Sequence, residues 1–217
     1  MIVVVGSPHL RFRGPKQEAA GTAVGVGAAA ATAGADVELV GKLGDDPAGE
    51  VVLLDLAGRG IGHVAILRDP SRPTPETADP DGADAEPFED PPGAAEQEPA
   101  DIPPGPTLEP ADIELALQYL PDYRVLVVAE PLGPAALDVV LAASRWSGAS
   151  LVIVLPHGAD PVDIPDATIL EAPEGDPDDA FASVVGGYAA ALDRGEEPAE
   201  AFASASTAGG WAAATAD

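Results

Sequence analysis

Short, mostly apolar runs that alternate with helix-like segments constrain the fold of this 217-residue chain more than any other feature. The runs are rich in Val, Ile and Leu and show no polar alternation, which is typical of strands buried on both faces of a sheet. Strand, helix and strand in succession, joined by short connections, imply right-handed parallel crossovers. The expected strands are residues 2–5, 37–40, 61–67, 124–129, 151–155 and 167–170.

The segments between these runs predict helices that cover the sheet. Aromatic residues make up only 4% of the chain, so the core must consist mainly of Ala, Val, Leu and Ile. We therefore expect a single three-layer α/β/α doubly wound domain over residues 1–217, with a mostly parallel sheet. The expected helices are residues 17–33, 47–56, 111–120, 133–147, 177–192 and 197–215.

The chain is strongly acidic, with 37 Asp and Glu against 10 Lys and Arg and a net charge of −27. Nucleic acids and anionic membrane surfaces bind clustered positive charge, so neither is an expected partner. The acidity suits either a salt-rich cytoplasm or a genome rich in GC codons. The lack of cysteine excludes disulfide and thiolate chemistry. Because the N-terminus lacks the basic region and long apolar run of a signal peptide, we expect a soluble cytoplasmic protein.

Residues 70–107 interrupt the alternation with an acidic segment rich in Pro, Ala and Gly, in which Phe88 is the one aromatic residue. This composition predicts a solvated, mobile loop, and a regulatory or partner-binding insert is the alternative. Strands are not expected here, because Pro is confined to the edges and bulges of sheets.

Residues 34–49 read GADVELVGKLGDDPAG and combine a strand, a glycine-containing turn and a helix start. Asp46 is the expected N-cap of that helix and Pro47 its first residue. The stretch resembles the motif G-A-x-V-x-L-V-G-x-V-G-D-D-x-x-G of the ribokinase-like (PfkB) carbohydrate kinases. Residues 179–195 resemble the second signature of that family, D-A-F followed by G-F-x-x-A-L-x-x-G. The resemblance covers residues 1–70 and 108–217 and implies a ribokinase-like fold.

The resemblance implies a catalytic base at Asp179, the position that takes the proton from the sugar hydroxyl in the family. The family's anion hole is a Gly-Ala-Gly stretch, and its three positions here hold Asp176, Pro177 and Asp178. Proline has no N–H and the two carboxylates repel phosphate, so we expect this anion hole to be degenerate. From the residues alone, Asp176 can cap a helix that begins at Pro177, and Asp179 is then expected to be a capping residue in its first turn.

Positions that contact the sugar in the family also differ. Arg11 stands where the resemblance places a sugar-binding Asp, and Gly25 stands where it places an Asn. His9 and His157 each follow an expected strand, and both are expected to be structural or solvated rather than ligands.

Two parts of the family architecture are expected to be missing. Few residues separate the first strand from the helix expected at residue 17, which leaves no room for long lid strands. Residues 171–174 are all that separates the last strand from Gly175, so the N-x-x-E motif and most of the nucleotide-binding section are expected to be absent.

Three hypotheses about function remain open. The first is a sugar-kinase homologue with impaired or no catalysis, whose scaffold binds a small molecule or a partner and for which no cofactor is expected. The second is an active ATP-dependent carbohydrate or nucleoside kinase with Asp179 as base, which would need ATP and Mg²⁺. The third is an interaction module that acts through residues 70–107. The sequence assigns no metal ligands, no substrate-binding residues and no oligomeric state.

Overall fold

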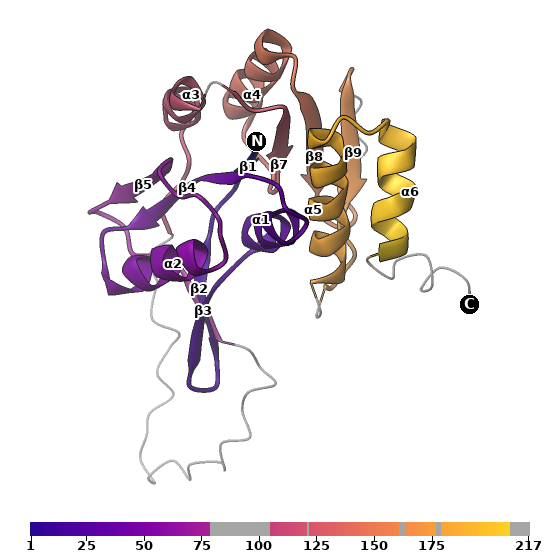
Figure 1. The fold of residues 1–217 in the computed structure, drawn as a ribbon. Coiled ribbons are helices and arrows are strands. Elements are labelled where there is room, and N and C mark those ends of the chain that lie inside the picture. The colour runs from indigo at the N-terminus through magenta and orange to yellow at the C-terminus, as the bar shows by residue number, and fades with distance from the viewer. Residues whose placement is uncertain (79–104, 121, 161–163, 177–178, 209–217) are drawn as a thin grey trace, which may run out of the picture.

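The computed structural model describes residues 1–217 except 79–104, 121, 161–163, 177–178 and 209–217. Its central sheet contains β1 (Ile2–Val5), β4 (Val37–Gly44), β5 (Ile66–Asp69), β7 (Val125–Val128), β8 (Ser150–Leu155) and β9 (Ala167–Glu171). These strands run parallel, as the apolar runs predicted, and their order is β5-β4-β1-β7-β8-β9 (Figure 1). β5 begins later than expected, and of the residues before it Gly62 makes only an isolated bridge to Glu38.

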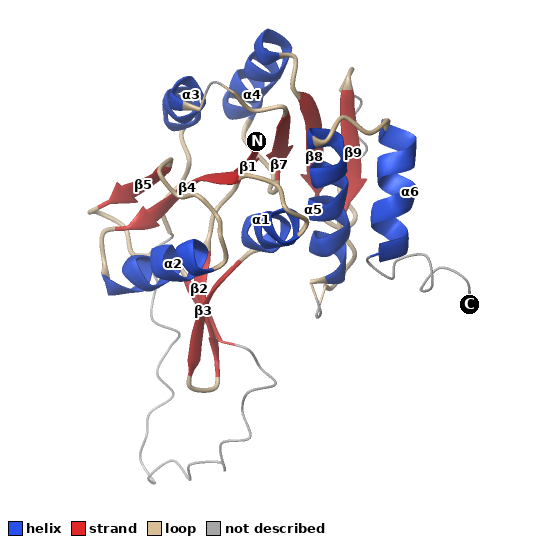
Figure 2. Ribbon diagram, viewed as in Figure 1, coloured by secondary structure: helices blue, strands red, loops and turns tan. Residues whose placement is uncertain are grey.

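Helices cover both faces of this sheet (Figure 2), which confirms the three-layer arrangement. One layer contains α1 (Thr22–Thr32), α2 (Pro47–Gly58), α5 (Ala180–Asp193) and α6 (Pro198–Ala208), and the other contains α3 (Pro110–Tyr119) and α4 (Pro134–Ser147). Alternate residues of β1 divide the two cores, since Ile2 and Val4 face the first layer whereas Val3 and Val5 face the second. All four side chains are fully buried, and each contributes about 1.5–3 kcal/mol to the free energy of folding.

The predicted turn between β4 and α2 is confirmed in detail. The Asp46 carboxylate accepts a hydrogen bond from the Gly49 N–H at 2.8 Å, and Pro47 is the first residue of the helix. Burial raises the pKa of Asp46, but hydrogen bonds from Thr74 and Gly49 outweigh that effect and hold the pKa below its ordinary value. The cap therefore stays ionised and fixes the start of α2.

The helix start expected at residue 17 is wrong, because strands of a small second sheet precede α1. Strands β2 (His9–Arg13) and β3 (Lys16–Ala20) form an antiparallel hairpin, and β6 (Glu76–Ala78) pairs in parallel with β2. The few residues before α1 suffice because a two-residue turn, with Gly14 at a φ of 58°, joins two short strands. The small sheet projects from the end of the domain (Figure 1). Residues 17–20 are accordingly strand rather than the start of a helix.

The acidic segment is ordered at its N-terminal end, contrary to the expectation for residues 70–107. Thr74 is buried, and its N–H and hydroxyl donate hydrogen bonds to the Asp46 carboxylate at 2.7 and 2.8 Å. The Thr74 hydroxyl in turn accepts the Gly44 N–H at 3.0 Å. These bonds place β6 beside the hairpin. The loop predicted for residues 79–104, including Phe88, lies outside the described residues.

Of the helices that the structure describes, not one has the length and apolar character needed to span a bilayer.

Candidate functional site

The sheet has a topological switch point between β1 and β7. From β1 the chain moves outward through β4 to β5, and it then returns to the other side of β1 to form β7, β8 and β9. In open parallel sheets ligands bind outside the carboxyl ends of the strands at such a point. The residues after β1 and β7 are therefore the first place to look for a site.

Ser7 and Glu130 meet at this switch point. The N–H and hydroxyl of Ser7 donate hydrogen bonds to the two oxygens of the Glu130 carboxylate, at 3.0 and 2.7 Å. A Cβ added to Gly6 would lie 2.7 Å from the Cβ of Ala23, so α1 lies close against the end of β1 here. Sequence reasoning named no role for Glu130. Its place directly after a buried strand next to the switch point is the signal that could have found it.

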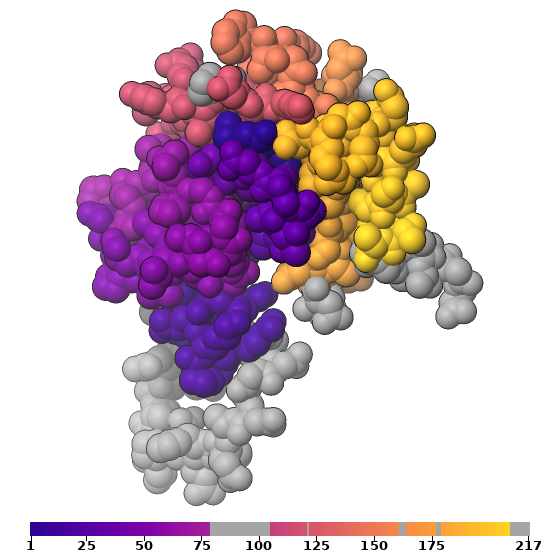
Figure 3. All heavy atoms as spheres, in the orientation of Figure 1, coloured from indigo at the N-terminus to yellow at the C-terminus, as the bar shows by residue number. Residues whose placement is uncertain are grey.

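The N-terminal parts of α1 and α5 face each other beside this point. A Cβ added to Gly25 would lie 2.8 Å from the Cβ of Ala182 and 4.0 Å from an oxygen of Asp179. Because Gly25 has no side chain, the predicted base Asp179 can lie close to α1. In Figure 3 the indigo atoms of α1 directly border the orange and yellow atoms of α5 and α6.

A groove of about 470 Å³ runs along this helix contact. Its wall consists mostly of small side chains, and Asp179 supplies a carboxylate at the N-terminal end of α5. The other lining residues include Gly25, Ala28, Ser183, Gly187 and Ala205. Asp179 therefore lies beside a hollow that a ligand could enter.

Asp176 caps α5, and the expectation that Asp179 does so with its side chain is wrong. The Phe181 and Ala182 N–H groups donate to the two oxygens of the Asp176 carboxylate at 2.9 and 3.1 Å. Asp179 holds the N-cap position with a left-handed φ of 52° and makes no side-chain cap bond. The helix begins at Ala180 rather than at residue 177, because the chain turns through this left-handed residue first. Pro177 and Asp178 lie outside the described residues.

Arg11 and His9, which the sequence analysis singled out, both lie on β2. Arg11, in the position of the sugar-binding Asp, donates two hydrogen bonds to Glu18, at 2.8 and 3.1 Å. Burial lowers the pKa of His9, and the nearby Arg11 charge lowers it further, so that the imidazole is neutral at pH 7. Its ring lies against Gly21 at the start of α1.

His157 is remote from the switch point. Its Nδ1 lies 3.6 Å from the Glu171 carboxylate, which also accepts the Gly158 N–H at 2.8 Å. His157 follows β8 and Glu171 is the last residue of β9, and these strands lie two and three positions away from β1 in the sheet order. Over the part of the chain that the structure describes, no three His, Asp or Glu side chains are grouped so that they could hold a metal ion.

The connection from β9 to α5 comprises residues 172–179. The chain therefore has no room there for the further strands and the nucleotide loop that the family resemblance implies, as the sequence predicted.

Comparisons with known proteins identify the fold. No protein-family model matches the sequence, and no curated protein does. A PfkB protein from Polaromonas sp. JS666 is similar in structure, with a TM-score of 0.63 and 16% identity over 96% of this chain and 94% of that chain. A proposed ribokinase II from E. coli, in its apo form, gives a TM-score of 0.65 and 10% identity over 96% and 91% of the two chains.

A proposed phosphofructokinase from Staphylococcus aureus gives a TM-score of 0.61 and 14% identity over 96% of this chain and 90% of that chain. These identities are low, and the agreement lies in the arrangement of strands and helices. These three solved structures are described as a PfkB protein, a proposed ribokinase and a proposed phosphofructokinase, and this chain has the ribokinase-like fold.

Proposed function

We propose that this protein is a sugar-kinase homologue that binds a small polar molecule at the switch point and has lost efficient phosphoryl transfer. The carboxylate of Asp176 is the observation that carries the proposal. It accepts the N–H groups of Phe181 and Ala182 at the N-terminus of α5. Free N–H groups at a helix N-terminus are what a kinase can aim at a phosphoryl group.

The side chain of Asp176 competes with phosphate for these donors. A phosphate that entered would have to displace the carboxylate or lie beside it, and two unit charges 4 Å apart repel by about 4 kcal/mol at an effective dielectric constant of 20. Loss of a single oxyanion donor typically lowers a rate by about 10²–10³-fold. Both effects favour a protein that binds a ligand without catalysing phosphoryl transfer.

One observation favours an active ATP- and Mg²⁺-dependent kinase as the second candidate. The Asp179 carboxylate is not used as a cap, and it lines the groove beside Gly25. A carboxylate in this place can accept a proton from a hydroxyl group if a substrate lies within about 3 Å. The two candidates differ in whether phosphate reaches the N-terminus of α5.

The switch-point crevice supports the binding part of the proposal. Glu130 and Ser7 place oxygen atoms at the switch point, where hydroxyl groups of a ligand can bind. The net charge of −27 supports partners that are neither nucleic acids nor anionic membranes.

Thermal unfolding with added Mg-ATP or inorganic phosphate tests the proposal. The wild-type melting temperature is expected to stay constant, whereas Asp176→Ala frees two N–H donors and is expected to gain stability with phosphate. A ligand at ten times its Kd adds about 1.4 kcal/mol, or about 3–5 °C for a chain of this size. The matched control is Glu174→Ala, which removes an exposed acid from the same connection.

A kinase assay with a panel of sugars and nucleosides separates the two candidates. Product formation by the wild type that is abolished in Asp179→Asn would contradict the proposal and establish the active kinase. The absence of product from the wild type, together with a phosphate response confined to Asp176→Ala, is the result that we expect.

A further inference from the structure

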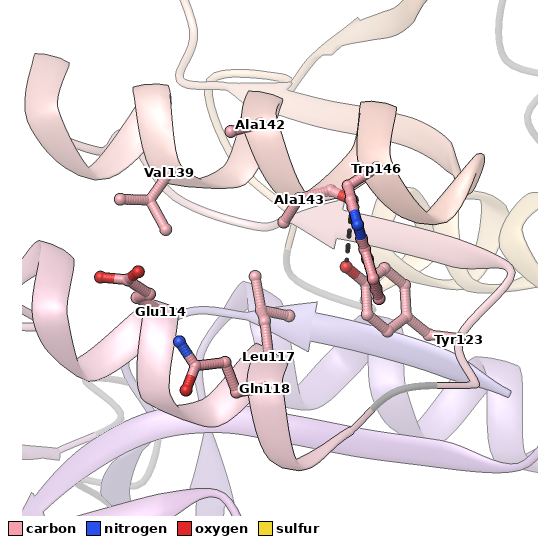
Figure 4. Close-up of a pocket in the computed structure, with 8 residues that line it drawn as sticks. All are labelled: Glu114, Leu117, Gln118, Tyr123, Val139, Ala142, Ala143 and Trp146. Carbon is pink, nitrogen blue, oxygen red and sulfur yellow. Dashed lines mark hydrogen bonds between the residues drawn. The ribbon is translucent and has the colours of Figure 1, made fainter.

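A second groove lies between α3 and α4, on the face of the sheet opposite the Asp179 groove (Figure 4). It has a volume of about 570 Å³ and an open mouth. Glu114, Leu117 and Gln118 of α3 form one wall, Val139, Ala142, Ala143 and Trp146 of α4 form the other, and Tyr123 closes one end. The proposed phosphate chemistry uses none of these side chains.

Trp146 is the residue that needs an explanation. It is 83% exposed in the last turn of α4, although tryptophan is usually well buried. The neighbouring Tyr123 is part of the core, with a hydroxyl that donates to the Ala143 carbonyl at 3.3 Å. Figure 4 shows the Trp146 ring standing beside Tyr123 at one end of the groove, with Glu114 and Val139 toward the other end.

One wall of the groove is a continuous face of α4. Val139, Ala142, Ala143 and Trp146 follow the i, i+3, i+4, i+7 pattern of one helix face. Leu117 and its neighbours Glu114 and Gln118 continue the surface on α3. An amphipathic helix binds such a groove through its own apolar face.

Charge determines what kind of helix fits. Glu114 is the charged residue among those that line the groove, and the exposed residues Asp138 and Arg145 lie next to Val139 and Trp146. The whole chain carries a net charge of −27. A second copy of the chain would bring the same acidic surface and be repelled. A partner with Lys or Arg beside its apolar face would instead be attracted and held in register.

We propose that the α3–α4 groove binds a basic amphipathic helix of a partner protein. The apolar face of that helix packs on Leu117, Val139 and Trp146, and its basic residues pair with Glu114 and Asp138. Aromatic residues such as Trp146 commonly carry most of the binding energy in interfaces of this kind.

The test uses a dye-labelled synthetic peptide of about 14 residues, with Leu at i, i+3, i+4 and i+7 and Lys elsewhere. A scrambled peptide of identical composition keeps the charge and loses the apolar face. Fluorescence anisotropy with the full chain at about 150 mM salt measures both affinities. We expect the amphipathic peptide to bind at least about 10-fold more tightly than the scrambled one.

Variants locate the binding. Trp146→Ala removes an exposed side chain and is expected to weaken binding by about 10-fold or more, while circular dichroism confirms an intact fold. Glu114→Gln is expected to weaken binding less and to reduce its salt dependence. Leu54→Ala is the matched control, because Leu54 is 77% exposed on α2, away from the groove, and its loss is expected to change the affinity less than about 2-fold.

Three results would overturn the proposal. The first is equal affinity for the amphipathic and scrambled peptides, which indicates charge attraction alone. The second is unchanged affinity of Trp146→Ala. The third is a dimer of the peptide-free protein, seen by sedimentation, that Trp146→Ala dissociates, since a second copy would then occupy the groove.

Discussion

Glu18 shows how one buried carboxylate ties the small sheet to the domain. It is 4% exposed on β3, and its oxygens accept hydrogen bonds from Lys16 at 2.6 Å and Arg11 at 2.8 Å. Arg59, which follows α2, lies 3.9 Å away and also pairs with Asp55 at 2.7 Å. The hydrogen bond from Lys16 lowers the pKa of Glu18 most, Arg11 adds to the effect, and the pKa falls from 4.5 to about 2 despite burial.

This pKa predicts an acid-sensitive contribution to stability. Because the folded-state pKa is depressed, the stabilisation is complete above the ordinary pKa of 4.5 and is lost as the pH falls toward about 2. We expect Glu18→Gln to lower the free energy of unfolding by about 3 kcal/mol at pH 7, and this gap to narrow below pH 5. Urea unfolding between pH 7 and pH 3 measures it.

Glu76→Gln is the control for that experiment, since Glu76 is exposed on β6 of the same small sheet. If the difference in free energy of unfolding between wild type and Glu18→Gln stayed constant over the whole pH range, packing rather than charge would explain the contribution of Glu18.

At the level of elements, the contact between α1 and α5 depends on glycine. A Cβ added to Gly186 would lie 2.5 Å from the Val26 carbonyl oxygen and 2.6 Å from the Ala29 Cβ. At Gly187 the nearest atom is the Ala205 Cβ, at an ordinary 3.6 Å. Two adjacent glycines in one helix therefore differ in whether a methyl group fits.

We expect Gly186→Ala to force the helices apart and to lower stability by about 1–3 kcal/mol, the usual cost of overpacking. Gly187→Ala is the matched control and is expected to be neutral or to stabilise by up to about 1 kcal/mol, because alanine favours helix. Denaturant unfolding compares the two. Equal effects of both substitutions would mean that α1 and α5 can separate at little cost.

The hairpin of β2 and β3 is the element that sequence reasoning missed. Its residues carry charges at Arg11, Arg13, Lys16 and Glu18, so no apolar run marks it as a strand. Glu18 forms ion pairs with Arg11 of the opposite strand, with Lys16 of its own strand and with Arg59 after α2. These ion pairs stabilise a hairpin that has no apolar run.

For the whole molecule, the excess of acid is the dominant electrostatic property. With 37 acidic residues and 10 basic ones, the folded chain concentrates negative charge that the unfolded chain spreads out. Salt screens this repulsion, since the Debye length falls from about 10 Å at 0.1 M to about 3 Å at 1 M.

We therefore expect the melting temperature to rise by several degrees between about 0.1 and 1 M NaCl. Calorimetry in tetramethylammonium chloride at equal ionic strength separates screening from specific binding of Na⁺, because screening predicts the same rise in both salts. A melting temperature that is flat or falls with salt would show that the acidic surface does not limit stability.

The sequence alone was enough to predict the buried strands, their parallel direction and the Asp46 cap. These features depend on residues close together in the chain, where hydrophobic period and helix-capping chemistry act directly. Only the tertiary structure revealed that Ser7 meets Glu130, that Thr74 binds Asp46, and that Asp179 makes no side-chain cap bond to α5. Such pairings depend on which strand ends and turns the folded topology brings together. They depend also on a left-handed turn at Asp179, a residue type that tolerates this conformation but does not require it.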